Sequence, residues 1–254
     1  MDFFDSHAHY NDDTFEYNRD ELITRMYENE ITNIICAGYS LEKSKLAIEI
    51  AEKYPHIFAI CGISPNDIEE NTLKNLKEIE EISKNKKVVA IGEIGLDYYW
   101  NKENKEVQKE LFSKQIDIAN RLNLPIVIHS RDAWVDTIEM LKQNPVIKKG
   151  VFHCCQLNQE LIKEALKLDF YISFSGNITF KNAKSAECIK LVPSDRILIE
   201  TDSPYLSPEP LRGTVNNSEN VKLVAKKIAE IKELDIAEVA EMTRKNTKRI
   251  FDIK

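Results

Sequence analysis

The chain has 254 residues, of which 43% are hydrophobic and 30% are charged, and its formal net charge is −7. This composition is typical of a globular protein with a substantial core. The negative charge argues against a broad basic surface for nucleic acid, although bound metal ions supply positive charge locally in many nucleases. We expect no transmembrane helix, because no run approaches about 18 apolar residues. We also expect no signal peptide and, with five cysteines in no disulfide-like spacing, a cytoplasmic location.

Short apolar runs rich in β-branched residues alternate with longer segments along the whole chain. Several runs, such as VVAIG, PIVIH and ILIE, are apolar almost throughout, which is typical of strands buried on both faces of a parallel sheet. The predicted strands are Phe3–Tyr10, Ile31–Tyr39, Ile57–Ile63, Val88–Asp97, Pro125–Asp132, Gly150–Cys155, Phe170–Ile178 and Ile197–Pro204.

The segments between these strands have apolar residues at three- and four-residue spacing, which predicts helices with one buried face. They are residues 17–30, 40–54, 105–122, 132–143, 158–168, 219–234 and 235–251, with Ser218 and Asp235 as predicted N-caps of the last two. Eight strands with crossovers in about 250 residues predict a closed (β/α)₈ TIM barrel. We expect one α/β domain over residues 1–254 with extra C-terminal helices. A doubly wound open sheet is the alternative.

Imidazole and carboxylate groups stand at the ends of five predicted strands. They are His7, His9, Glu93, His129, His153 and Asp202. Active sites of parallel barrels lie at the C-terminal ends of the strands, so we expect these groups to converge. His7 and His9 are two residues apart on one strand and should share a face. A single histidine at a strand end is more often an ordinary loop residue, and His56, which precedes its strand, is interpreted in that way.

Four imidazoles and two carboxylates suit zinc, manganese, cobalt, nickel or iron, and they tolerate magnesium. Six groups exceed the three protein ligands of one tetrahedral catalytic ion. Two divalent metal ions about 3.5–4 Å apart and bridged by Glu93 use the set better. We assign His7, His9 and Asp202 to one ion, and His129 and His153 to the other. Asp202 is the predicted general base toward a metal-activated water, with Glu200 behind the ligands.

Several longer motifs resemble the TatD family of metal-dependent deoxyribonucleases. The matching pieces are DSHAHY, AIGEIGLDYY, FSKQIDIANRLNLPIVIHSRDA, FHC, ILIETDSPYLSP, RGTVNNSENV and NTKRIF. The resemblance implies a metal-dependent barrel that hydrolyses DNA phosphodiester bonds, often as a 3′→5′ exonuclease on single-stranded or frayed ends. The resemblance also implies that the metal ligands of the family correspond to the same six residues. The chain departs from the family pattern at Ser64, at CCQL after His153, and at Ser218.

Other residues near the predicted strand ends are candidates for binding substrate. Arg131 shares a face with His129 and suits a phosphate, although an ion pair with Asp132 is an equal alternative. Arg212 suits either a phosphate or the stability of its own loop. Tyr98, with the two aromatic residues after it, either stacks on unpaired bases or covers the top of the barrel. The two cysteines after His153 fit buried packing better than soft-metal binding.

Two other functions remain open on the sequence alone. The same metal site would also serve a hydrolase of a small amide, ester or lactone. A metal-binding protein without catalytic activity is a third interpretation, which the complete set of ligands and the predicted base argue against.

Overall fold

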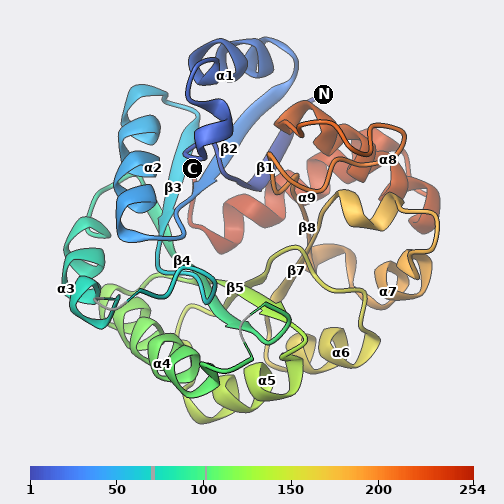
Figure 1. Cartoon of the computed structure of the whole chain (residues 1–254). Coiled ribbons are helices and arrows are strands. Elements are labelled where there is room, and N and C mark those ends of the chain that lie inside the picture. The colour runs from blue at the N-terminus through green and yellow to red at the C-terminus, as the bar shows by residue number, and fades with distance from the viewer. Residues whose placement is uncertain (70–71, 101) are drawn as a thin grey trace.

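The computed structural model describes residues 1–69, 72–100 and 102–254. Eight strands of these residues form one parallel sheet in chain order, and Figure 1 shows them at the centre of a ring of helices. The strands are β1 (Phe3–Ala8), β2 (Ile31–Ala37), β3 (Ile57–Cys61), β4 (Val88–Asp97), β5 (Ile126–Arg131), β6 (Gly150–Phe152), β7 (Tyr171–Phe174) and β8 (Ile197–Ile199). Every predicted strand is present, generally with a shorter C-terminal end.

The chain after β8 returns to β1 and brings the two edges of the sheet together. The backbone N–H of Asp202 donates to the carbonyl of His7 at 2.9 Å, and the N–H of His9 donates to the carbonyl of Ser203 at 2.7 Å. The hydroxyl of Ser6 also donates to the carbonyl of Ile199 at 2.9 Å. The predicted TIM barrel is therefore confirmed, and the doubly wound open sheet is wrong.

The helices surround the strands in chain order (Figure 1). They are α1 (Arg19–Glu28), α2 (Leu41–Lys53), α3 (Thr72–Ile82), α4 (Lys105–Leu122), α5 (Trp134–Gln143), α6 (Gln159–Lys167), α7 (Ser185–Leu191), α8 (Val221–Lys232) and α9 (Ile236–Ile250). Short 3₁₀ turns are η1 (Asp13–Phe15), η2 (Gly176–Thr179), η3 (Ser194–Arg196) and η4 (Ser218–Asn220). The sequence interpretation did not include α3 or α7. Among the described residues, no helix combines the length and apolarity needed to cross a bilayer.

The two predicted N-caps have different outcomes. Asp235 caps α9 in a capping box with Glu238, as predicted. The prediction for Ser218 is wrong, because this residue opens η4 and α8 begins only at Val221. The Ser218 hydroxyl instead donates to the buried carboxylate of Asp5 at 2.5 Å.

Apolar side chains fill one end of the barrel interior and leave the other end polar. Residues from the early part of the strands, such as Phe4, Val127 and Leu198, form a buried cluster that Phe251 and Ile253 join from the C-terminal tail. A second, larger cluster lies between the strands and the surrounding helices. The interior at the C-terminal ends of the strands is therefore available for polar groups, and the candidate site lies there.

Candidate active site

Irregularities in two strands turn the site residues toward the barrel interior. In β1, whose Phe4 faces the interior core, the pairing with β2 shifts register between Asp5 and Ala8. In β4 the pairing with β5 shifts between Ile91 and Ile94. An extra residue in a strand reverses the faces of the residues that follow it, and such bulges are common next to active sites. Simple alternation along either strand would not have given these orientations.

Glu93 therefore lies within β4, at the irregularity, and not at the strand end where the sequence placed it. The strand continues to Asp97. The close approach of β5 requires glycine at Gly95, which has a φ of +141°. A Cβ atom there would lie 2.0 Å from the carbonyl oxygen of His129.

Four donor atoms face one another at the polar end of the barrel. They are Nε2 of His7, Nε2 of His9, Oε2 of Glu93 and Oδ1 of Asp202. The two nitrogens are 3.2 Å apart, and each lies 3.3–3.7 Å from the two oxygens. Donors about 2.1 Å from a tetrahedral ion are themselves about 3.4 Å apart, so this spacing fits one shared cation. We call these four atoms the His7–His9 group.

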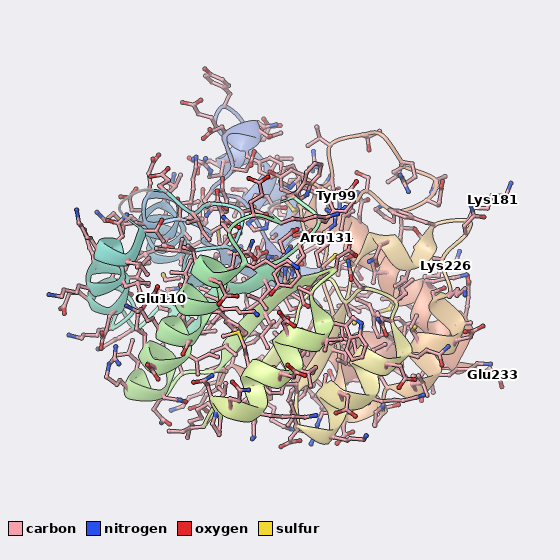
Figure 2. The ribbon with its side chains drawn as sticks, turned by 60° about the horizontal axis from the view of Figure 1, so that its bottom comes forward. Tyr99, Glu110, Arg131, Lys181, Lys226 and Glu233 are labelled. Carbon is pink, nitrogen blue, oxygen red and sulfur yellow. The ribbon has the colours of Figure 1, made fainter. Side chains whose placement is uncertain are left out.

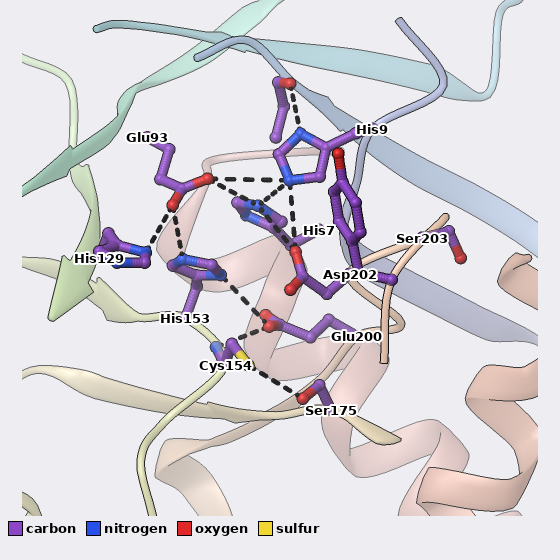
Figure 3. Close-up of polar contacts among 12 residues, drawn as sticks. His7, His9, Glu93, His129, His153, Cys154, Ser175, Glu200, Asp202 and Ser203 are labelled. Carbon is purple, nitrogen blue, oxygen red and sulfur yellow. Dashed lines mark hydrogen bonds and ion pairs between the residues drawn. The ribbon is translucent and has the colours of Figure 1, made fainter. Parts of the chain in front are cut away.

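The other carboxylate oxygen of Glu93 faces a second pair of imidazoles. Oε1 lies 2.7 Å from Nδ1 of His129 and 3.1 Å from Nε2 of His153. Figure 3 shows Glu93 between the two pairs, with one oxygen directed to each. We call Glu93 Oε1 and the two imidazoles the His129–His153 group. The six residues predicted from the sequence thus converge on one place, and the donor types suit divalent cations.

Each imidazole of the His129–His153 group has a second carboxylate nearby, which is hydrogen-bonded to His129 and lies at ion-pair distance from His153. Nε2 of His129 lies 2.9 Å from Oδ2 of Asp97, and Nδ1 of His153 lies 3.4 Å from Oε1 of Glu200. Such partners orient the ring and fix its tautomer. The sequence interpretation placed Glu200 behind the ligands but did not single out Asp97. The position of Asp97 at the end of its strand, beside the strand that carries His129, was the available signal.

Asp5 is a second residue that sequence reasoning missed. It is fully buried, and its carboxylate accepts hydrogen bonds from the hydroxyl of Thr201 at 2.6 Å and from the backbone N–H of Thr201 at 2.9 Å. Burial outweighs these hydrogen bonds and raises the pKa of Asp5 to about 7. The contacts join β1 to the segment that carries Asp202, so Asp5 helps to position both sides of the His7–His9 group.

The electrostatics of the site differ from one imidazole to the next. Burial and the neighbouring charge of His153 lower the pKa of His7. Burial also favours the neutral form of His129, but the hydrogen bonds to Asp97 and Glu93 outweigh it and raise that pKa to about 9. Burial alone would raise the pKa of Glu93, yet the charge of His153 and the hydrogen bonds hold it well below its usual range.

The site opens into a pocket of about 940 Å³. Arg131 and Trp100 line this pocket beside Glu93 and His129. The alternative ion pair between Arg131 and Asp132 is absent from the described residues, where Arg131 instead packs on aromatic rings.

The other two predicted substrate contacts lie elsewhere. Tyr98 is 7% exposed, and its hydroxyl donates to Asp136 at 2.7 Å. Arg212 is exposed and stacks on Phe180, with its guanidinium carbon 3.6 Å from the ring centroid. Neither residue lines the pocket. Trp100, which belongs to the same aromatic run as Tyr98, does line it.

Two of the three departures from the family pattern, Ser64 and the residues after His153, contribute to the pocket wall, whereas Ser218 does not. Ser64 is buried and lines the pocket beside Asn66, whose side chain donates to Asp97 at 3.1 Å. Cys154 also lines the pocket, and burial raises the pKa of its thiol well above the usual range. A protonated thiol is a poor ligand for a metal ion, which agrees with the packing interpretation of the two cysteines.

Comparison with known proteins places this geometry in a family. Residues 4–252 match the family described as TatD related DNase. The chain belongs to this family. It is 43% identical over 252 residues to the Bacillus subtilis protein named "Uncharacterized metal-dependent hydrolase YabD", covering 98% of this chain and 99% of that protein. The Escherichia coli K12 protein named "Uncharacterized metal-dependent hydrolase YcfH" is 34% identical to this chain, and the match covers 100% of this chain and 97% of that protein.

Solved structures agree with this assignment. The TatD homologue YJJV from Escherichia coli superposes with a TM-score of 0.92 at 26% identity, covering 99% of this chain and 98% of that one. A TatD family hydrolase from Entamoeba histolytica has the same fold, with a TM-score of 0.87 at 24% identity and coverage of 100% and 99%. The protein is thus a metal-dependent hydrolase of the TatD family with a TIM-barrel fold.

Proposed function

We propose that this TatD family member hydrolyses phosphodiester bonds of DNA, as a 3′→5′ exonuclease on single-stranded or frayed ends. The observation that carries the proposal is the position of Glu93 between two imidazole pairs, with a different carboxylate oxygen facing each pair. This is the arrangement that a bridging carboxylate adopts between two cations. The name of the matched family supports DNA as the substrate.

The two groups of donors would each hold one divalent cation. His7, His9 and Asp202 would bind one ion, His129 and His153 would bind the other, and Glu93 would bind both. Such ions supply positive charge that makes a water molecule more acidic and neutralises charge on the phosphoryl oxygens. The donor set favours nitrogen- and oxygen-binding metals and does not single out one of them.

Asp202 is the proposed general base. Its side chain is 14% exposed, in contrast to the fully buried His7, so it lies at the boundary between the imidazoles and the pocket. The water oxygen forms a bond to phosphorus, its proton passes to Asp202, and the bond from phosphorus to the leaving oxygen breaks. The proton then leaves with that oxygen, so that charge and atoms balance.

The charge of the protein agrees with a substrate that enters end first. A chain with a net charge of −7 has little attraction for the length of a duplex. A single phosphodiester needs only the local positive charge of the metal site and of Arg131. A free end, whose bases are not held in a double helix, reaches a recessed site more easily than an internal linkage does.

A cleavage assay on end-labelled oligonucleotides tests the proposal. The protein is loaded with Mg²⁺ or Mn²⁺ and given single-stranded and duplex DNA, with EDTA and Asp202→Asn as controls. We expect mononucleotides to be released from the 3′ end of single strands, and activity to be lost in both controls. Intact DNA with every metal, together with metal-dependent cleavage of a small ester, amide or lactone, would instead favour the alternative hydrolase.

A further inference from the structure

A cluster of two aromatic rings and one guanidinium stands at the rim of the pocket. The guanidinium carbon of Arg131 lies 3.9 Å from the ring centroid of Tyr99 and 5.4 Å from that of Trp100. The two rings are perpendicular, with centroids 4.7 Å apart. Figure 2 shows Tyr99 and Arg131 next to each other at one end of the barrel. We call Tyr99, Trp100 and Arg131 the rim clamp.

The rim clamp offers apolar surface to the pocket. Tyr99 is 49% exposed and Trp100 is 65% exposed. Exposed apolar surface beside a pocket commonly marks a binding site. Trp100 and Arg131 line the same pocket as Glu93 and His129, so this surface continues directly into the catalytic site.

The guanidinium of Arg131 contacts aromatic rings and forms no ion pair with another described residue. Arg121 and Arg196 each pair with a carboxylate at 2.8 Å, whereas Arg131 has no carboxylate partner among the residues that the structure describes. Its guanidinium lies over the ring of Tyr99, and a guanidinium without a carboxylate partner has N–H donors for an incoming ligand. A guanidinium held in this way is well suited to bind a phosphate through two parallel hydrogen bonds.

One carboxylate connects the rim clamp to the catalytic site. Oδ1 of Asp97 accepts the backbone N–H groups of Tyr99 and Trp100, each at 2.9 Å. Oδ2 of the same residue lies 2.9 Å from Nε2 of His129. The backbone N–H of Tyr98 also donates to the carbonyl of Arg131 at 2.9 Å. These bonds fix the distance from the rim clamp to His129 and make it a built part of the pocket wall.

We propose that the rim clamp is the nucleotide subsite of this enzyme, where the base of an unpaired nucleotide stacks on Trp100 and its phosphate binds Arg131. The inference rests on the proposed function. It explains why the proposed exonuclease would prefer single strands. A base can lie against Trp100 only after it has left its neighbours in a duplex.

The test compares a normal single strand with one whose last two 3′ nucleotides lack bases. The holoenzyme, loaded with Mn²⁺, is assayed for kcat/KM on both strands. Its affinity is measured on the same pair carrying a non-cleavable methylene-phosphonate linkage. For the wild type, we expect the bases to improve kcat/KM and affinity by between about 5-fold and about 150-fold, the range for stacking of one base on an aromatic ring. Trp100→Ala should remove this preference, so that kcat/KM and affinity for the normal strand fall to the values for the baseless strand.

Two further variants complete the comparison. Arg131→Lys keeps the charge but loses the planar guanidinium, so it should lower kcat/KM and affinity for both strands by the same factor. Tyr27→Ala removes a ring that is 54% exposed and lies on α1 outside the pocket, so it should change neither.

The inference is overturned if the wild type does not distinguish the two strands, or if Trp100→Ala keeps the full preference. Loss of cleavage in every sample, with a Trp100-dependent preference in binding, would refute the DNase proposal and leave the subsite standing. Cleavage of both strands at equal rates would support the DNase proposal and refute the subsite.

Discussion

The two halves of the site share one carboxylate but differ in how they are held. In the His7–His9 group, the five measured separations between donor atoms are 3.2–3.7 Å, close to the spacing around a cation. In the His129–His153 group, the imidazoles lie 2.7 and 3.1 Å from Glu93, which are hydrogen-bond lengths. The first group already has spacings close to those around one cation, and the imidazoles of the second lie closer to Glu93, within hydrogen-bonding distance.

The difference predicts two sites of unequal character. The pKa of His7 is lowered, which favours the neutral imidazole that binds metal. Burial alone would also lower the pKa of His9, but the hydrogen bond and charge of Asp202 raise it, so only one imidazole of the His7–His9 group has a lowered pKa. The pKa of His129 is raised to about 9, and that of His153 is also raised by the charge of Glu93 and hydrogen bonds against the effect of burial. A cation entering the His129–His153 group must therefore displace protons. We expect the His7–His9 group to fill first and the other group to exchange its ion more readily.

The largest expected effect is that of Glu93→Gln, because this residue belongs to both groups. An amide has only one oxygen and cannot serve two cations. We expect both groups to lose metal and the hydrolytic rate to fall by at least about 10³-fold, as measured by metal analysis and steady-state kinetics. Glu80→Gln is the control, since Glu80 forms a surface ion pair with Arg121. Normal metal content in the Glu93 variant would remove the basis for a shared ligand.

The substitution Asp97→Asn should lower metal affinity at one group and not at the other. The amide cannot hold the His129 imidazole as the carboxylate does, so affinity at the His129–His153 group should fall about 10- to 100-fold while the His7–His9 group is unchanged. Calorimetric titration of the metal-free protein measures both sites. Asp136→Asn is a matched control, because Asp136 bonds to Tyr98 and Lys109 outside the pocket. An equal loss at both sites would mean that the two groups are not independent.

The pH dependence of metal affinity should also differ between the groups. Because the folded pKa of His129 is about 9, above its usual 6.5, the imidazolium is stabilised below pH 6.5 and loses this stabilisation as pH rises through 9. Metal competes with that proton, so affinity at the His129–His153 group should rise by up to about tenfold per pH unit for each proton displaced, and level off above pH 9. Titrations at several pH values measure this slope. A steeper slope at the His7–His9 group would reverse the comparison.

The smallest effect is expected for Glu200→Gln. Glu200 lies 3.4 Å from His153, farther than Asp97 lies from His129, and its oxygen also accepts the backbone N–H of Cys154 at 2.6 Å. Glutamine retains an oxygen for that backbone contact. We expect a loss of about tenfold or less in metal affinity, confined to the His129–His153 group and visible in the same calorimetric titration. A larger loss than for Asp97→Asn would show that the distance to the imidazole does not decide the contribution of these carboxylates.

Much of this site could be predicted from the sequence, because each ligand follows an apolar run that local pattern identifies as a strand. Residues at the ends of parallel strands meet in a barrel, which is why His7, His129 and Asp202 could be brought together without coordinates. Asp97 ends its strand in the same way and could have been found by this reasoning, whereas the role of Asp5, which lies before the strand end, could not. The carboxylate of Asp5 binds Thr201, a residue that local sequence gives no reason to connect with it.

The failures on the substrate side have a similar cause. Tyr98 and Trp100 are close in sequence, but the turn after β4 buries the first and exposes the second. Alternation along a strand could not resolve this, because Asp97 bends the backbone by accepting two N–H groups beyond the strand end. The bulges in β1 and β4 are likewise seen only in the pairing with neighbouring strands, which the sequence pattern of one strand does not give.

The most direct test is anomalous diffraction from crystals of the protein loaded with Mn²⁺. We predict two peaks about 3.5–4 Å apart, with one beside His7, His9 and Asp202 and the other beside His129 and His153. Glu93 should lie between them with one oxygen on each. A single peak at full Mn²⁺ occupancy, or two peaks that do not share Glu93, would contradict the account.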